Sequence, residues 1–232
     1  KIGRMLTEMG LTDCEVIVGY QLSYPEENIR TLMPEQCVEV TEEGLYTCLI
    51  RNPHWQPERL THGRADTCFL RDTSETEGKI HRTPMTKEEV REVSICKLNL
   101  TQNAVVYDIG SGTGSVAIEI AGVPGGVQVY AIERKPEAVE LLRKNREHFH
   151  MDNIQIIEAP APEGLEELPV PTHAFIGGSG GRLLDILQVL YRKNPHMRIV
   201  INAISMETIA ELKEVLDTFP VEEEEILQMQ VS

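Results

Sequence analysis

Long apolar runs, aromatic residues and paired cysteines are scarce in this sequence. No run of about 18 apolar residues is present to span a bilayer, and no segment has the charged start and apolar core of a signal peptide. The five cysteines are widely spaced and form no C-x-x-C pair, so neither a zinc site nor a disulfide framework is expected. We therefore predict a cytoplasmic protein with reduced thiols, no metal centre and no membrane partner.

A surplus of positive charge is also missing. The 232 residues include 22 Lys and Arg against 37 Asp and Glu, which gives a formal net charge of −15. Proteins that bind nucleic acid normally present a basic surface to the phosphate backbone. The composition therefore argues against a nucleic-acid partner and favours a soluble, acidic enzyme.

A polar stretch divides the chain. "RDTSETEGKIHRTP" lacks an apolar period and ends in proline, so we place a linker at residues 73–83. Residues 1–72 contain short β-like runs ("CEVIVGYQL", "CVEVTE", "LYTCLIRNP") and a polar-faced helical pattern ("SYPEENIRTLM"), which indicates a small α/β domain. Because the first residue is Lys1 and residues 1–6 resemble the middle of a helix, we expect a fragment without its natural start.

The second domain, residues 84–232, alternates apolar strand patterns with amphipathic helices. Its first helix, "TKEEVREVSICKL", begins with Thr86 and Glu89 at the spacing of a capping box. Strand patterns then start at "NAVVYDIG", "VQVYAIE", "IQIIEA", "HAFIGG" and "RIVINAI", each followed by a helical pattern. This alternation predicts a mostly parallel, doubly wound α/β sheet of the Rossmann-like class. The terminal "VEEEEILQMQVS" is predicted as one more strand with a solvated start.

The first of these strands leads into a glycine-rich loop, in "VVYDIGSGTGSVAIEIAG". Gly110, Gly112 and Gly114 let backbone N–H groups approach a ligand at the start of a helix. Asp108 precedes the first glycine, where its charge would repel the pyrophosphate of a dinucleotide. A carboxylate suits a cationic ligand instead, and S-adenosylmethionine (SAM) carries a sulfonium and an ammonium without a phosphate.

The second strand of the domain ends in an acidic residue, Glu133. An acid at this place accepts hydrogen bonds from ribose hydroxyls in nucleotide-binding folds, so Glu133 indicates a nucleoside cofactor without distinguishing a dinucleotide from SAM. A tight strand–helix turn without a ligand is the alternative. The order Asp-x-Gly-x-Gly-x-Gly followed by Glu resembles the cofactor motifs of the class I SAM-dependent methyltransferases.

Five small residues, Gly177-Gly178-Ser179-Gly180-Gly181, follow the fourth strand. They leave room for a large substrate, and the helix that begins near Arg182 can receive carboxylates at its N–H groups. A flexible loop without a ligand is the alternative. Class I enzymes that methylate amino groups often carry Asn-Pro-Pro-Tyr here, so this loop argues against an amino-nitrogen target.

Four segments together resemble the C-terminal half of the precorrin-6Y C(5,15)-methyltransferases (decarboxylating): "PMTKEEVREVSICKLNL", "DIGSGTGSVAIEIA", "EAPAPEGL" and "FIGGSGG". This resemblance covers about residues 80–232. Two earlier segments, "VIVGYQLSYPEENIR" and "HGRADTCFLR", are similar to the end of the tetrapyrrole methylase domain that precedes this half in fused members. The resemblance implies methylation of a corrin precursor at carbon 15 and decarboxylation of its carbon 12 acetate arm, in cobalamin biosynthesis.

The resemblance also implies features beyond this chain. The carbon 5 methylase site of the fused enzymes would be truncated here, and the enzyme is expected to be a homo-oligomer, often a tetramer. The last strand of the sheet is expected to be missing. Pro160 stands where the family often has Asp, while Ala161 keeps the backbone position near the adenine.

The site residues follow from the loop chemistry and the resemblance. The cofactor set, for SAM and its product S-adenosylhomocysteine (SAH), is Thr86, Asp108, Gly110, Ser111, Gly112, Thr113, Gly114, Glu133 and Ala161. The substrate set is Gly177, Gly178, Ser179, Gly180, Arg82 and Arg182. No catalytic acid or base is identified.

Local positive charge must oppose the acidic balance of the chain if the substrate carries many carboxylates. Residues 79–82 ("KIHR"), Lys87, Arg91 and Arg182 cluster in sequence around the predicted site. We expect Arg82 and Arg182 to dock carboxylate arms, with solvated surface arginines as the alternative.

Two other functions stay open. One is a different class I methyltransferase that acts on RNA or a small molecule, although the acidic balance disfavours RNA. The other is a SAM-binding module without catalytic activity, which SAM binding without turnover would indicate.

Overall fold

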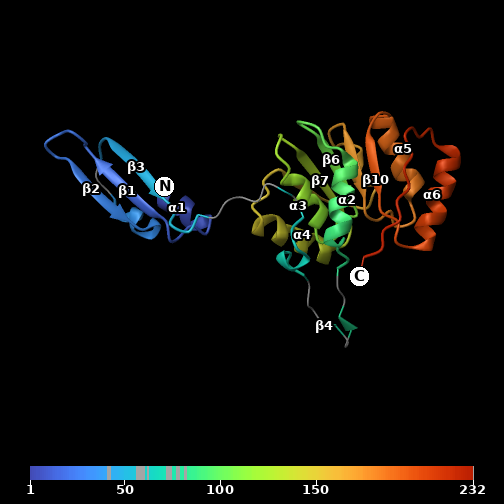
Figure 1. Ribbon diagram of the computed structural model, residues 1–232, viewed down its shortest axis with the longest axis horizontal. Coiled ribbons are helices and arrows are strands. Elements are labelled where there is room, and N and C mark those ends of the chain that lie inside the picture. Colours follow the sequence, from blue (N-terminus) through green and yellow to red (C-terminus); the bar gives the residue numbers. More distant parts are fainter. Residues whose placement is uncertain are drawn as a thin grey trace. The chain divides into compact units, whose positions relative to one another are not determined.

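The computed structural model describes residues 1–40, 43–55, 61, 63–71, 75–76, 79–80 and 83–231 (Figure 1). The chain forms two compact units, Lys1–Leu60 and Thr61–Ser232. Within the predicted linker, β4 (Glu75–Thr76) and β5 (Lys79–Ile80) form a short antiparallel pair. Residues 73–74, 77–78 and 81–82 of that linker lie outside the described residues.

The first unit is built on a three-stranded antiparallel sheet in the order β2-β1-β3. Its elements are α1 (Ile2–Glu8), β1 (Glu15–Tyr20), β2 (Asn28–Leu32), the 3₁₀ helix η1 (Pro34–Glu39) and β3 (Tyr46–Arg51). Val16 and Val18 point to the same face of β1 and pack with Leu6 of α1 in a small core.

Two sequence-based predictions in this unit are wrong. A helix is predicted over "SYPEENIRTLM", but Asn28–Leu32 form β2, because this segment pairs with β1 from Val16 to Tyr20. A strand is predicted over "CVEVTE", but its first three residues, 37–39, fall in η1, which begins at Pro34. In both cases the tertiary setting overrides a weak local pattern.

A five-stranded parallel sheet forms the centre of the second unit. Its strands are β6 (Val105–Ile109), β7 (Gln128–Glu133), β8 (Ile154–Glu158), β9 (His173–Ile176) and β10 (Arg198–Ile201). They lie in the order β10-β9-β6-β7-β8, so the chain winds outward from β6 in one direction and then in the other. The predicted doubly wound sheet is confirmed.

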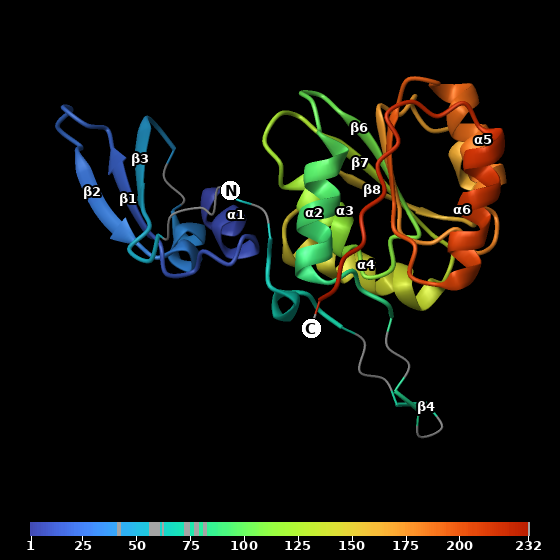
Figure 2. The ribbon, with the colours of Figure 1, turned by 45° about the vertical axis from the view of Figure 1, so that its right-hand side comes forward.

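Helices cover both faces of this sheet (Figure 2). One face carries α2 (Glu88–Leu98), α3 (Ser115–Ala121) and α4 (Pro136–His148); the other carries α5 (Leu183–Lys193) and α6 (Met206–Thr218). The 3₁₀ helices η2 (Asp66–Cys68) and η3 (Glu163–Leu165) complete the unit. Residues of β6 alternate between the two cores, with Val106 facing α2–α4 and Tyr107 facing α5–α6, so β6 is buried on both sides.

The residues after α6 do not form the predicted strand. No strand is present over the described part of "VEEEEILQMQVS", residues 221–231. Its glutamates pair instead with two cations: Glu225 lies 2.6 Å from Lys97, at the end of α2, and Glu223 lies 3.6 Å from Arg198. Lys97 lies in the last turn of α2 and Arg198 begins β10, so the segment passes these two elements without joining the ladder of β10.

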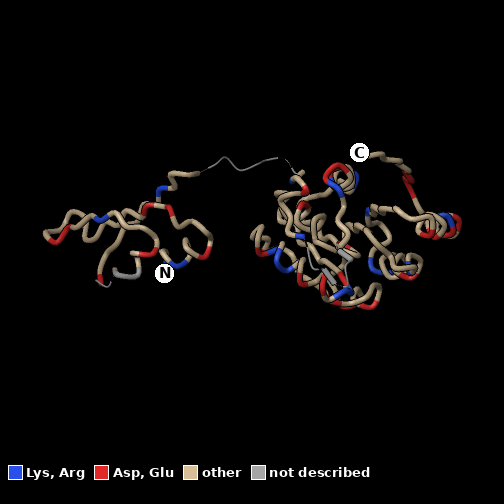
Figure 3. The backbone as a smooth tube through the Cα atoms, turned by 90° about the horizontal axis from the view of Figure 1, so that it is seen from below, with Lys and Arg blue, Asp and Glu red and all other residues tan. Residues whose placement is uncertain are grey.

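Acidic residues are distributed along both units, with basic residues interspersed (Figure 3). The helices of the described chain are all too short or too polar to cross a lipid bilayer. Because charge is spread over both units, it does not indicate a binding site, whereas the topology of the sheet does. In a parallel sheet, the expected place is the crevice at the carboxyl ends of the strands where their order reverses.

Candidate functional site

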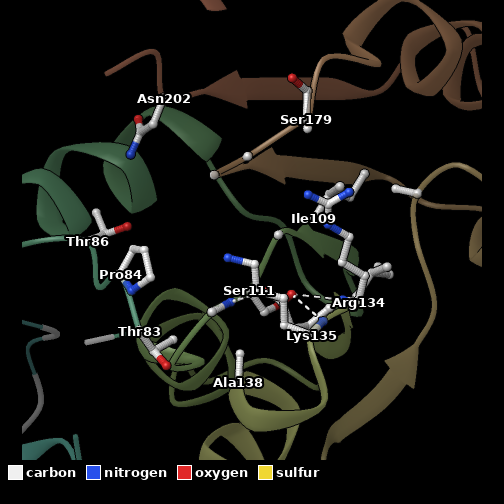
Figure 4. Close-up of a pocket in the computed structure, with 18 of the residues that line it drawn as sticks. Thr83, Pro84, Thr86, Ile109, Ser111, Arg134, Lys135, Ala138, Ser179 and Asn202 are labelled. Carbon is white, nitrogen blue, oxygen red and sulfur yellow. Dashed lines mark hydrogen bonds between the residues drawn. The ribbon is translucent and has the colours of Figure 1, made fainter. Parts of the chain in front are cut away.

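A pocket of about 530 Å³ lies at this reversal point, at the carboxyl ends of β6, β7 and β9. Its lining includes the last residues of two strands, Ile109 and Glu133, and the loops that follow β6 and β9. The chain segment that leads into α2 closes another side with Pro84 and Thr86 (Figure 4).

Most of the predicted site residues line this pocket. They are Thr86, Gly110, Ser111, Gly112, Glu133, Ala161, Gly177, Gly178, Ser179, Gly180 and Arg182. Asp108, Thr113 and Gly114 are buried beneath the glycine loop and do not line the pocket. Arg82 lies outside the described residues.

The glycine loop passes so close to two walls of the pocket that a side chain would not fit at Gly110 or Gly112. Gly110 and Gly112 have φ angles of +75° and +55°, which side-chain-bearing residues rarely adopt. A Cβ on Gly110 would lie 2.8 Å from the carbonyl oxygen of Gly178, and one on Gly112 2.8 Å from that of Pro84. The loop therefore presents bare backbone to a ligand.

Three backbone N–H groups hold the carboxylate of Glu133. Its Oε2 accepts from Gly112 at 2.9 Å, and its Oε1 accepts from Arg134 at 2.8 Å and Lys135 at 2.9 Å (Figure 4). Glu133 thereby ties the glycine loop to the end of β7. A carboxylate offers about four acceptor positions, so one remains for a ligand hydroxyl.

Asp108 is fully buried under the loop, and neither of its carboxylate oxygens has a hydrogen-bond partner among the described residues. The Ser111 hydroxyl donates to the main-chain carbonyl of Asp108, at 2.8 Å. Burial raises the pKa of Asp108 to about 7, and the charge of Glu133 acts in the same direction. A cation in the pocket would stabilise the ionised form of this costly group.

The buried carboxyl should make stability depend on pH. Its pKa in the folded chain, about 7, exceeds the ordinary value near 4, so the folded state binds the proton more tightly. Stability present at low pH is therefore lost as pH rises from about 4 to 7. We expect this loss, of several kcal/mol, to be missing in Asp108→Asn, which has no carboxyl to ionise.

Urea unfolding of both proteins, at intervals from pH 4.5 to about pH 8, measures this difference. The unfolding free energy of the wild type should fall relative to that of Asp108→Asn across this range. Parallel pH profiles for the two proteins would contradict the prediction.

Thr86 lines the pocket but does not cap α2. The helix begins at Glu88 after Lys87, and its N-terminus receives no side-chain cap from the described residues, so the predicted capping box of Thr86 with Glu89 is wrong. The Thr86 carbonyl instead accepts a hydrogen bond from the buried guanidinium of Arg91. This contact fixes the backbone of Thr86 and leaves its side chain on the pocket wall (Figure 4).

Arg91 is part of a buried network and cannot belong to a basic surface around the site. Its guanidinium lies 2.6 Å from Asp66 and 4.0 Å from Glu119, and its side chain is fully buried. Glu119 in turn pairs with Arg64 at 3.2 Å and accepts a hydrogen bond from the N–H of Gly63. The network holds residues 63–66 against α2 and α3 within the second unit.

The pocket lining is basic although the chain is acidic. Arg182 is at its edge, but its guanidinium already pairs with Glu163 at 2.5 Å and with Asp185 at 3.1 Å. Three further cations line the pocket without an ion pair to any described residue: Lys87, Arg134 and Lys135. Among the described lining residues, Glu133 alone is acidic. Local charge therefore opposes net charge here.

Several residues that line the pocket were not predicted from the sequence. Arg134 and Lys135 directly follow Glu133, which was predicted to bind the ligand, so their place in the sequence could have indicated that they line the pocket too. Asn202 and Ile204 follow β10 at the same edge of the sheet, and only the strand order places them beside the loop after β9.

Comparison with known proteins adds to this geometry. The precorrin methyltransferase domain family matches residues 80–231. A cobalt-precorrin-6B C(15)-methyltransferase (decarboxylating) of Salmonella typhimurium is 39% identical over 127 residues, which span 54% of this chain and 65% of that protein.

Two solved structures are also similar, each with 36% sequence identity, a TM-score of 0.59 and coverage of 67% of this chain. One is a precorrin-6Y C5,15-methyltransferase of Geobacter metallireducens, matched over 79% of its chain. The other is a precorrin 8W decarboxylase of Methanobacterium thermoautotrophicum, matched over 81%. With the family match spanning more than half of its residues, this chain belongs to the precorrin methyltransferase domain family.

Proposed function

We propose that this chain transfers a methyl group from SAM to carbon 15 of a corrin precursor and removes carbon dioxide from its carbon 12 acetate arm, in cobalamin biosynthesis. The observation that carries the proposal is a basic pocket, built around a bare glycine loop, in a chain of net charge −15. The name of the Salmonella typhimurium protein combines methylation at carbon 15 with decarboxylation of a cobalt-precorrin, and that of the Methanobacterium thermoautotrophicum protein gives decarboxylation of a precorrin.

The pocket residues fit SAM as the cofactor. Glu133 keeps one acceptor position for a ribose hydroxyl, and the unpartnered carboxylate of Asp108 favours a cationic ligand over a pyrophosphate. Bound SAM supplies an electrophilic methyl group and leaves SAH as the product. We propose that Thr86, Gly110, Ser111, Gly112, Glu133 and Ala161 contact it, and that Asp108, Thr113 and Gly114, which do not line the pocket, act from behind these residues.

The chain's own contribution is to bind and orient the substrate. An electron-rich ring carbon needs no protein nucleophile, and correct orientation alone lowers a barrier by several kcal/mol. The loop after β9 leaves space for a large molecule, since a Cβ on Gly178 would meet no heavy atom within 4 Å. We propose that Gly177, Gly178, Ser179, Gly180, Arg82 and Arg182 face the substrate, and that Lys87 adds positive charge for its carboxylate arms.

Mass spectrometry of the chain incubated with SAM and a precorrin already methylated at carbon 5 tests this proposal. We expect the substrate to gain one methyl group and lose carbon dioxide. A parallel titration with SAH separates the two ways to fail. SAH binding without turnover would contradict the proposed substrate, and failure to bind SAH would contradict the proposed cofactor.

We also propose three features of the wider protein. Residues 1–72 form the end of a tetrapyrrole methylase domain, joined by residues 73–83 to the methyltransferase domain at residues 84–232. The enzyme acts as a homo-oligomer, and it works in the cytoplasm. The resemblance of "VIVGYQLSYPEENIR" and "HGRADTCFLR" to fused family members supports the first feature.

A further inference from the structure

An apolar side chain at the pocket has no packing role in the described fold. Ile204 lines the pocket, yet it is 91% exposed. It directly precedes Ser205, the N-cap of α6, whose hydroxyl accepts from the N–H of Thr208 at 3.2 Å. An apolar residue at that place often packs on the fourth helical residue, here Ile209, as a hydrophobic staple. With Ile204 so exposed and Ile209 itself 49% exposed, this staple is not formed.

The loop that carries Ile204 is fixed at both ends. At one end, the N–H of Asn202 donates to the carbonyl of Ile176 at 3.0 Å, which extends the pairing of β10 with β9. At the other end, Ser205 caps α6. Only two residues separate these anchors, so the position of Ile204 at the pocket is a property of the fold.

This end of the pocket is separate from the end that contains Glu133. Asn202 and Ile204 follow β10, whereas Glu133 ends β7, and two strands lie between β10 and β7 in the sheet. At a usual strand spacing, the two ends are roughly 14 Å apart. Asn202 and Thr86 lie on the α2 side of the pocket, and Ser179 lies on the β9 side (Figure 4).

The chemistry of this end is apolar and electropositive. Ile204 and Val90 supply apolar surface, Asn202 supplies an amide, and Lys87 supplies a positive charge without an ion pair to any described residue. The amide oxygen of Asn202 lies 3.4 Å from the hydroxyl of Ser94, which donates its proton to the carbonyl of Val90 at 2.7 Å, so Asn202 is close to α2 without a short hydrogen bond to Ser94. A large apolar ring with carboxylate arms would satisfy all of these groups at once.

We propose that Ile204 packs against the face of the corrin-precursor ring and that Asn202 hydrogen-bonds one of its carboxylate arms, so that this loop selects the substrate. The inference rests on the proposed function, because it names how that substrate is held. Covering an exposed isoleucine removes apolar surface from water, and this favours binding. The protein need not change its fold for the substrate to cover Ile204.

Ile204→Ala tests the apolar contact. Because the side chain is exposed in the free protein, the variant should keep the thermal midpoint and the SAH Kd of the wild type. We expect its KM for the corrin precursor to rise roughly tenfold, as for loss of apolar contact in a binding site. Ile226→Ala is the matched control, since Ile226 is 79% exposed and does not line the pocket.

Asn202→Asp tests the polar contact with a side chain of nearly the same shape. Its carboxylate would repel a carboxylate arm, so we expect the KM to rise more than in Asn202→Ala, again with SAH binding unchanged. If the wild type turns over the precursor and both Ile204→Ala and Asn202→Asp keep its KM and kcat, the inference is wrong and the proposed function stands. If the wild type binds SAH but never converts the precursor, both are wrong.

A change of oligomeric state in Ile204→Ala, measured by sedimentation, would also overturn the inference. That outcome would show that a second copy of the chain, and not the substrate, covers Ile204. We expect the wild type, Ile204→Ala and Ile226→Ala to sediment alike.

Discussion

Glu133→Ala should weaken SAH binding by about two orders of magnitude, because one carboxylate both orders the glycine loop and meets the ligand. Its oxygens accept three backbone N–H groups, from Gly112, Arg134 and Lys135. Hydrogen bonds to a charged group contribute about 1.5–3 kcal/mol each, so loss of the loop contact and of a ribose contact together reaches this magnitude. Isothermal titration with SAH measures the effect.

Glu158→Ala is the matched control for this experiment. Glu158 ends β8 and lies opposite Glu133 in the register of the two strands, but it does not line the pocket. Its carboxylate is about half exposed and pairs with Arg143 at 3.2 Å. We expect this variant to bind SAH like the wild type, since an exposed pair contributes little to stability. Wild-type affinity in Glu133→Ala would refute the role of Glu133.

The parallel sheet of the second unit could be predicted from sequence because local pattern and tertiary structure agree in its five strands. The strand at Val105–Ile109 is a short apolar run that ends at glycines, and it is buried on both faces as such a run requires. The segment that became β2 has no such agreement. Its polar residues allow a helix locally, and only pairing with β1 makes it a strand.

The pocket was predictable at the two glycine loops and at Glu133, where a recognised pattern follows a strand, and less so where distant contacts decide. Thr86 was assigned to the site and to a capping box, but the helix begins one residue later, since the N–H of Arg91 donates to the carbonyl of Lys87 and makes Lys87 the N-cap. Lys87 and Lys135 line the pocket without an ion pair to the described part of the chain, whereas Arg91 is buried in ion pairs. Sequence shows that a residue is basic, but not whether a partner already neutralises it.

Electrostatics connects the fold to the proposed reaction. A chain of net charge −15 repels a polycarboxylate at long range, and that repulsion is screened beyond about 10 Å at 0.1 M salt. At the pocket the balance is reversed, since its lining has several cations and Glu133 is already bound by backbone N–H groups. The attraction is therefore local, and it acts on a substrate that has reached the pocket.

Gly110→Ala should nearly abolish SAH binding and also destabilise the second unit. At a φ of +75°, an alanine is strained by about 1–3 kcal/mol. Its Cβ would in addition lie 2.8 Å from the carbonyl oxygen and 2.9 Å from the nitrogen of Gly178. Both are backbone atoms, so one of the two loops must move and the pocket between them must change shape.

Gly178→Ala separates the shape of the pocket from the strain of the loop. Gly178 shares the same loop contact, but its φ is not positive, and a Cβ there would meet no heavy atom within 4 Å. We expect its thermal midpoint to match the wild type while turnover of the corrin precursor falls, because the added methyl group occupies space at the pocket.

Thermal unfolding and turnover, measured on both Gly110→Ala and Gly178→Ala, give the comparison. Equal losses of thermal midpoint in both variants would contradict this geometry, as would wild-type SAH affinity in Gly110→Ala. A stable but slow Gly178→Ala, beside a Gly110→Ala that is unstable and does not bind, would show that the two glycine loops differ in role: the first forms the cofactor cradle, and the second keeps space for the substrate.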